Sequence, residues 1–155
     1  NMKHKKIVLF ALTLYILALF YFLFFCRINS DNGMAYNEWL STSINIMPLK
    51  NVFIFLTTPY ITPSYVFSFI KNIFGNIMLF LPMGYFLPCL FNKSSKVKIY
   101  IIINLFFSLF IEITQVIFML GLFDVDDIIL NVLGSVIGFY LFGLIRKIKF
   151  NCGKG

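Results

Sequence analysis

The feature that most constrains the fold is a set of four apolar blocks, each long enough to cross a lipid bilayer. They occupy residues 7–26, 72–91, 99–122 and 128–145. A helix needs roughly 20 apolar residues, at about 1.5 Å rise each, to cross the hydrocarbon core. Only 12% of the 155 residues are charged, whereas a soluble domain has about 25%. The sequence therefore predicts an all-α integral membrane protein of four transmembrane helices, as one domain over 2–149 with a tail at 150–155.

The first block is predicted to remain in the protein as a helix. It follows a short basic segment that begins at Lys3 and resembles the start of a signal peptide. The apolar run 7–26 is longer than the 7–15 residues of a typical signal core, and no small-x-small cleavage site follows it.

The basic residues predict the orientation in the cell membrane. With a cytoplasmic N-terminus, ten fall inside: Lys3, Lys5, Lys6, Lys93, Lys96, Lys98, Arg146, Lys147, Lys149 and Lys154. Three fall outside: Arg27, Lys50 and Lys71. This bias places both termini in the cytoplasm and a long extracytoplasmic loop between the first two helices. Because the net charge of +7 is explained at helix ends, no nucleic-acid partner is expected.

The segment 52–70 is apolar enough to be considered as a fifth span. It contains Pro59 and Pro63, which interrupt a helix by removing N–H donors. We therefore predict an extracytoplasmic loop that lies on the outer leaflet or re-enters it. Tyr36 and Trp39, earlier in the same loop, suit the membrane interface.

The cysteines and the histidine predict neither a disulfide nor a bound cofactor. Cys26 falls at the outer side alone, while Cys89 and Cys152 fall at the cytoplasmic side. A single His leaves no zinc-type ligand set.

A polar stripe runs along the 99–122 helix, at Asn104, Ser108, Glu112 and Gln115. This spacing places the four side chains on one helix face. Because a carboxyl group facing lipid costs about 2.5–3.5 kcal/mol, the stripe is expected to face the bundle interior. Glu112 is either a functional group, with general base as its candidate catalytic role, or a neutral partner of Asn76 or Asn131 that joins helices.

An acidic loop follows, with carboxylates at Asp124, Asp126 and Asp127. Asp124 can cap the 128–145 helix, and the other two complement the positive end of its dipole. Three carboxylates in four residues also make them candidate ligands for a divalent cation or for a cationic substrate group. Both interpretations remain open from the residues alone.

The last two candidate features concern helix packing. Asn131, Gly134, Ser135 and Gly138 share one face, and Gly134 and Gly138 have the small-x-x-x-small spacing of a packing surface. That face is also the candidate surface for a homo-oligomer. On the 72–91 helix, Asn76 falls in the outer third. The candidate binding residues thus converge near the outer leaflet from three helices: Asn76, Glu112, Gln115, Asp124, Asp126, Asp127 and Asn131.

These motifs together resemble the VanZ-like family. The ordered strings are Gly75-Asn76-Ile77-x-x-Phe80-x-Pro82-x-Gly84, Ile111-Glu112-x-x-Gln115, and Asp124-Val125-Asp126-Asp127-Ile128-Ile129-x-Asn131-x-x-Gly134-x-x-x-Gly138, preceded by Asn45-x-x-Pro48. The resemblance covers about residues 45 to 145. Many relatives carry an Arg before the acidic cluster, where this chain has Met119-Leu120-Gly121-Leu122. If that Arg binds an anionic group in relatives, this chain must do without the contact or use Lys50 or Lys71.

The resemblance implies a small membrane protein of Gram-positive type, whose name-giving relative confers low-level teicoplanin resistance. The first hypothesis is a resistance or envelope protein that binds a membrane lipid, a lipid-linked envelope precursor or the lipoglycopeptide itself. The second is a membrane enzyme on a lipid-linked substrate, with Glu112 as base and a metal held by the acidic loop. The third is a transporter subunit. The absence of an activated Ser, Cys or His favours the first.

Overall fold

The computed structural model describes residues 2–25, 35–91 and 97–152. Its elements are, in order, α1 Met2–Phe24, α2 Tyr36–Thr42, β1 Ile44–Asn45, α3 Lys50–Thr57, α4 Pro63–Leu90, α5 Val97–Ile117, β2 Phe123–Asp124 and α6 Val125–Cys152. The expectations for Cys26, Arg27, Lys93, Lys96 and Lys154 concern residues outside the described ones.

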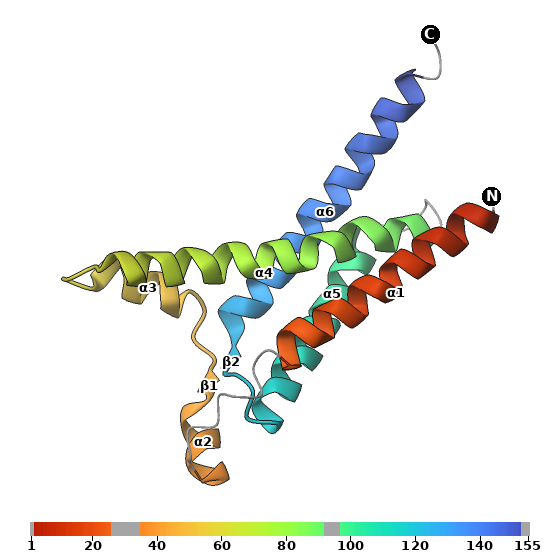
Figure 1. Ribbon diagram of the computed structural model, residues 1–155. Helices are drawn as coiled ribbons and strands as arrows, with labels where there is room; N and C mark the ends of the chain where they lie inside the picture. The colour runs from red at the N-terminus through yellow and green to blue at the C-terminus, as the bar shows by residue number, and fades with distance from the viewer. Residues whose placement is uncertain (1, 26–34, 92–96, 153–155) are drawn as a thin grey trace.

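The four predicted spans are present in the described part of the chain. α1, α4, α5 and α6 are each long and apolar enough to cross a membrane, so the protein is a multi-pass membrane protein. Figure 1 shows that α4 crosses α6, while α1 and α5 lie beside α4. The first turn of α1 and the last turns of α4 and α6 point toward one end of the bundle. Both termini thus lie at the same end, and which compartment that end faces stays a prediction.

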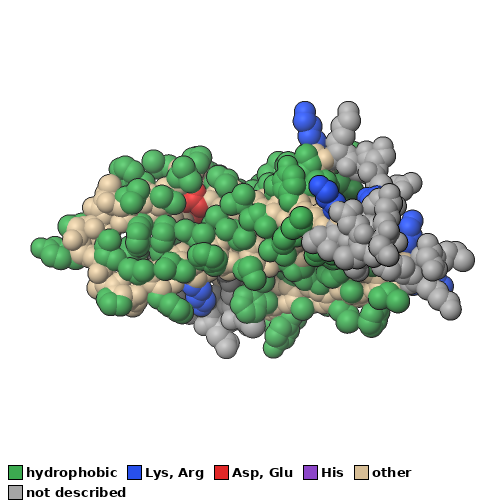
Figure 2. Space-filling model, turned by 90° about the horizontal axis from the view of Figure 1, so that it is seen from above, with side chains coloured by type: hydrophobic (Ala, Val, Ile, Leu, Met, Phe, Trp, Pro, Cys, Tyr) green, Lys and Arg blue, Asp and Glu red, His purple; other side chains and the backbone are tan. Residues whose placement is uncertain are grey.

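The surface fits a lipid environment. Figure 2 shows apolar side chains over most of the visible face, with most of the visible Lys and Arg side chains gathered at the end of the molecule where the termini lie. Large apolar side chains such as Phe10, Phe67 and Phe106 are about two-thirds exposed. In water this exposure would be costly, whereas lipid chains cover such side chains without penalty.

α4 and α6 extend beyond their predicted bounds, and α4 does so because one proline was interpreted as a helix breaker. α4 begins at Pro63, not at residue 72, and has 28 residues. Pro63 occupies the first turn, where the missing N–H is not needed, and the hydroxyl of Thr62 accepts a hydrogen bond from the Tyr65 N–H. α6 likewise runs from Val125 to Cys152.

The third span ends earlier than predicted. α5 stops at Ile117, not at residue 122, because Met119 adopts a left-handed conformation with φ 56°. The Leu120 N–H donates to the Gln115 carbonyl at 2.8 Å, and the Met119 N–H donates to that of Val116 at 3.1 Å. This pair of bonds is the usual left-handed helix stop, here without glycine. Gln115 therefore lies in the last turn of α5.

The segment between α1 and α4 contains structure that the predicted loop did not include. It contains α2, β1 and α3, joined to α6 by the parallel pairing of β1 with β2. Trp39 of α2, expected at the membrane interface, is buried, and its indole N–H donates to the Val116 carbonyl at 3.3 Å. α3 occupies part of the apolar stretch 52–70 and keeps large apolar side chains exposed, such as Phe53 and Leu56.

Glycine permits the close crossing of α4 and α6. A Cβ atom at Gly134 would lie 2.3 Å from the Ile77 carbonyl oxygen, and one at Gly138 would lie 2.0 Å from that of Leu81. The predicted packing surface is therefore confirmed, with α4 as its partner. α4 of the same chain lies against this face, and the homo-oligomer that the sequence suggested stays a prediction.

The orientation can be tested on α2. We expect a cysteine that replaces the exposed Glu38, in a chain whose three native cysteines are changed to Ser, to react with an impermeant maleimide added to intact cells. Reaction only after the membrane is permeabilised would contradict the predicted topology. A cysteine at Lys147, on the opposite end of the bundle, is the matched control and should show the reverse pattern.

Candidate functional site

The polar stripe of α5 faces the protein interior, as predicted. Asn104, Ser108, Glu112 and Gln115 are all buried, with at most 3% of each exposed. The stripe contacts α6 and α1 directly. The Asn131 amide on α6 donates to the Ser108 hydroxyl at 2.8 Å, and the Gln115 amide donates to the Leu23 carbonyl of α1 at 3.3 Å. The stripe therefore joins three helices of the bundle.

Glu112 binds the backbone where α6 begins, and its expected pairing with Asn76 or Asn131 stays a prediction. Its Oε2 atom accepts the backbone N–H of Asp124 at 3.2 Å. The amide of Asn131 donates to Ser108, and that of Asn76 donates to Asp127 at 2.7 Å. Glu112 thus holds the chain where α6 begins, which is a positioning role for a buried carboxylate.

Asp124 caps α6 and also binds the segment before α4. Its Oδ1 atom accepts the Asp126 N–H at 2.9 Å, which is the capping bond that the sequence predicted. The same oxygen accepts the amide of Asn45 at 2.9 Å, and Oδ2 accepts the amide of Asn51 at 2.8 Å. Asn45, the first residue of the Asn45-x-x-Pro48 motif, therefore anchors β1 to the acidic loop.

Asp126, which lies on α6, caps the N-terminus of α3. Its carboxylate accepts the backbone N–H of Leu49 and, at 3.1 Å, that of Asn51. α3 has no side-chain cap of its own, because Leu49 occupies the capping position with φ 59°. A buried carboxylate at a helix N-terminus satisfies N–H groups that have no helical partner and complements the dipole.

Asp127 binds α4 instead of its neighbours. Its Oδ1 atom accepts the amides of Asn72 at 3.1 Å and Asn76 at 2.7 Å. The three aspartates of the loop are therefore engaged by donors from different parts of the chain. In the part of the chain that the structure describes, no group of three His, Cys, Asp or Glu side chains could hold a metal ion. The geometry thus favours the structural interpretation of the acidic loop.

One hollow among the described residues lies between α1 and α4, whereas the pocket that the sequence suggested between the outer halves of α4, α5 and α6 stays a prediction. The volume of the hollow between α1 and α4 is about 530 Å³. The lining residues are Phe22, Leu23, Ser68, Lys71, Asn72, Gly75, Asn76, Met78 and Leu79. Of the predicted binding residues, Asn76 lines this hollow, and Asp126 lines a second one of about 50 Å³ beside α3.

Several residues of the network were not predicted. Asn51, Asn72 and the backbone of Leu49 bind the acidic loop. Asn72 had a usable signal, since it lies four residues before Asn76 and thus on the same helix face. Asn51 and Leu49 had none, because nothing local indicates that α3 begins against a carboxylate from α6.

Comparison with known proteins agrees with the resemblance in the motifs. The family model described as VanZ/LLP1 matches residues 12–146. A protein of Enterococcus faecium named Protein VanZ is 31% identical over 87 residues, which cover 56% of this chain and 53% of that protein. The aligned region thus spans about half the length of that relative. No solved structure matches the chain.

Proposed function

The chain belongs to the VanZ/LLP1 family, and on this premise we propose that it lowers the susceptibility of a Gram-positive cell to acylated glycopeptides such as teicoplanin. It does so at the outer leaflet of the cell membrane, by binding a lipid-like ligand. The observation that carries this proposal is the hollow of about 530 Å³ between α1 and α4, which combines apolar walls with a polar end. Such a combination is what an amphiphile requires.

The location of the hollow supports a ligand that arrives through the membrane. It is lined by two helices that are apolar enough to span a bilayer, and Phe22 and Met78 on its walls are more than half exposed. A molecule with an acyl chain can enter from the lipid phase, where its local concentration is high. A molecule that is dissolved only in water reaches the hollow less often.

The binding role fits the structure better than the enzymatic alternative. The candidate base, Glu112, is 3% exposed and accepts the Asp124 N–H, and it lines neither hollow. The aspartates of the candidate metal site each accept hydrogen bonds from the protein. We therefore assign a structural role to these residues, which is to position the helices and loops around the hollow.

Expression in a susceptible Gram-positive host tests the proposal. We expect the inhibitory concentration of teicoplanin to rise more than that of vancomycin, because teicoplanin has an acyl chain that partitions into the outer leaflet and vancomycin has none. Equal protection against both drugs, or none against either at normal expression, would contradict it.

Glu112→Gln, measured in the same assay, separates binding from catalysis. The amide oxygen of Gln can still accept the Asp124 N–H, so we expect resistance to be retained. A general base would lose its function with the same change. Loss of resistance at normal membrane levels would therefore favour the enzymatic alternative.

A further inference from the structure

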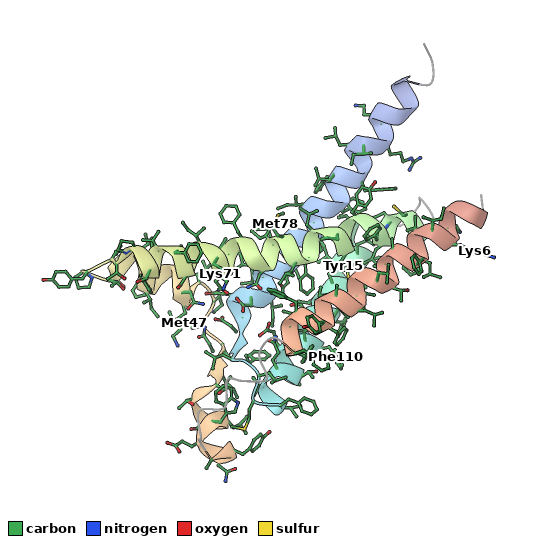
Figure 3. The ribbon with its side chains drawn as sticks, in the orientation of Figure 1. Lys6, Tyr15, Met47, Lys71, Met78 and Phe110 are labelled. Atoms are coloured by element: carbon green, nitrogen blue, oxygen red, sulfur yellow. The ribbon has the colours of Figure 1, made fainter. Side chains whose placement is uncertain are left out.

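The hollow between α1 and α4 has a charged end and an apolar end. Ser68, Lys71, Asn72 and Gly75 follow one face of α4 at helical spacing, and all four line it. Further along the same face, Met78 and Leu79 line the hollow together with Phe22 of α1. Figure 3 shows Lys71 nearer the α3 end of α4 and Met78 nearer the middle of that helix. A ligand in this hollow thus meets a cation at one end and hydrocarbon at the other.

A bilayer with one boundary at Leu90 puts Lys71 at the depth of the lipid phosphates of the other leaflet. α4 has 28 residues, which at 1.5 Å per residue make it about 42 Å long, whereas the hydrocarbon core is about 30 Å thick. Counting roughly 20 residues back from Leu90, the end of α4 near the termini, reaches Lys71. The exposed ammonium group is therefore placed at the boundary between hydrocarbon and headgroups.

The charge of the hollow favours an anion. Among the described residues that line it, Lys71 is the only charged one, and the Ser68 hydroxyl is a further hydrogen-bond donor. Asp127 does not line it, and its Oδ1 atom accepts the amides of Asn72 and Asn76. The Asp127 carboxylate therefore lies behind the two asparagines that line the hollow. The charged group that a ligand meets in the hollow is the Lys71 ammonium group.

From this arrangement we infer that the hollow binds an anionic phospholipid, with its phosphate at Lys71 and Ser68 and one acyl chain along Met78, Leu79 and Phe22. The inference rests on the proposed function and specifies its ligand class.

Lipid titration of the purified full-length chain in neutral detergent tests the charge. The probes are dioleoyl phosphatidylglycerol and dioleoyl phosphatidylcholine, which share their acyl chains, and the readout is the rise in melting temperature. We expect the apparent affinity for the anionic lipid to be about fivefold higher, the factor that about 1 kcal/mol for one basic residue at an anionic surface gives. Lys71→Gln should remove this preference and Lys71→Arg should keep it. Lys50→Gln, an exposed lysine on α3 that lines neither hollow, is the matched control.

A second pair of variants tests the cavity. A Cβ atom at Gly75 meets nothing within 4 Å, so Gly75→Phe is expected to fold and to fill the hollow. It should weaken the binding of both lipids. Gly143 on α6 also has open space around it but does not line the hollow, so Gly143→Phe should bind lipid as the unmodified chain does.

The outcomes separate this inference from the proposed function. An unchanged preference for the anionic lipid in Lys71→Gln, or full competition by inorganic phosphate, would overturn the lipid site even if the chain confers resistance. Loss of the preference in Lys71→Gln supports the lipid site even where teicoplanin resistance is absent, in which case the proposed function fails alone.

Discussion

Gly84→Ala is expected to destabilise the protein more than any other single-methyl addition. A Cβ atom at this position of α4 would lie 1.8 Å from the carbonyl oxygen of Ser135 on α6. Because the obstructing atom belongs to the backbone, it cannot rotate away, and the two helices must separate along the most extensive contact of the bundle. Overpacking typically costs about 1–3 kcal/mol, and we expect the upper end of that range or more. Gly84→Leu should yield no folded protein.

Thermal unfolding in detergent, followed by circular dichroism, measures this loss. Gly143→Ala is the control, because it adds the same methyl group to a helix glycine with open space around it. It should leave stability unchanged or raise it by up to about 1 kcal/mol through the helix preference of Ala. A melting temperature of Gly84→Ala equal to that of the unmodified chain would show that α4 and α6 do not cross as described.

Asp126→Ala is expected to have the second-largest effect, because it removes the acceptor for two backbone N–H groups at the start of α3. Leu49 is exposed and Asn51 is half-buried, so water replaces part of each lost bond, and each donor costs the low end of the about 1–3 kcal/mol of an unsatisfied buried group. The loss of a carboxylate at a helix N-terminus adds about 0.3–1 kcal/mol. We expect a total loss of about 2–4 kcal/mol. The amide N–H groups of Leu49 and Asn51 should also exchange with solvent much faster, since both donate to Asp126.

Asp126→Asn distinguishes the cap from a metal site. Asn retains one acceptor oxygen, so if the residue is a cap, Asp126→Asn should lose only about half of the free energy of unfolding that Asp126→Ala loses. A metal ligand would lose its function with the same change, and the unmodified protein would gain stability from Mg²⁺ or Ca²⁺. A rise in melting temperature with either ion, abolished by Asp126→Asn, would contradict the structural role given to the acidic loop.

The membrane class and the inward face of α5 were predictable because they depend on strong local signals. Four apolar blocks of bilayer length require four spans, and a carboxyl group in such a block must avoid lipid. Glu112 and Gln115 are buried for that reason. The cap at Asp124 was equally predictable, because an Asp before an apolar helical run accepts an N–H of the first turn whatever the rest of the chain does.

Helix ends were predicted less well, because they depend on competing local effects. Pro63 was interpreted as a breaker, although a proline in the first turn of a helix costs nothing. The stop at Met119 precedes Gly121, the residue that the glycine rule would select, because other contacts of this region, such as Trp39 on the Val116 carbonyl, favour the earlier end.

The amino-acid sequence by itself determined which residues avoid lipid and where the chain crosses the membrane, since both follow from the free energy of transfer of each side chain. Only the tertiary structure decided which groups meet. Asp126 binds backbone N–H groups about 75 residues earlier in the chain, so no local pattern indicates that partner. The hollow at Lys71 likewise exists because α1 and α4 diverge beside it, and divergence is a property of two packed helices that neither sequence segment contains.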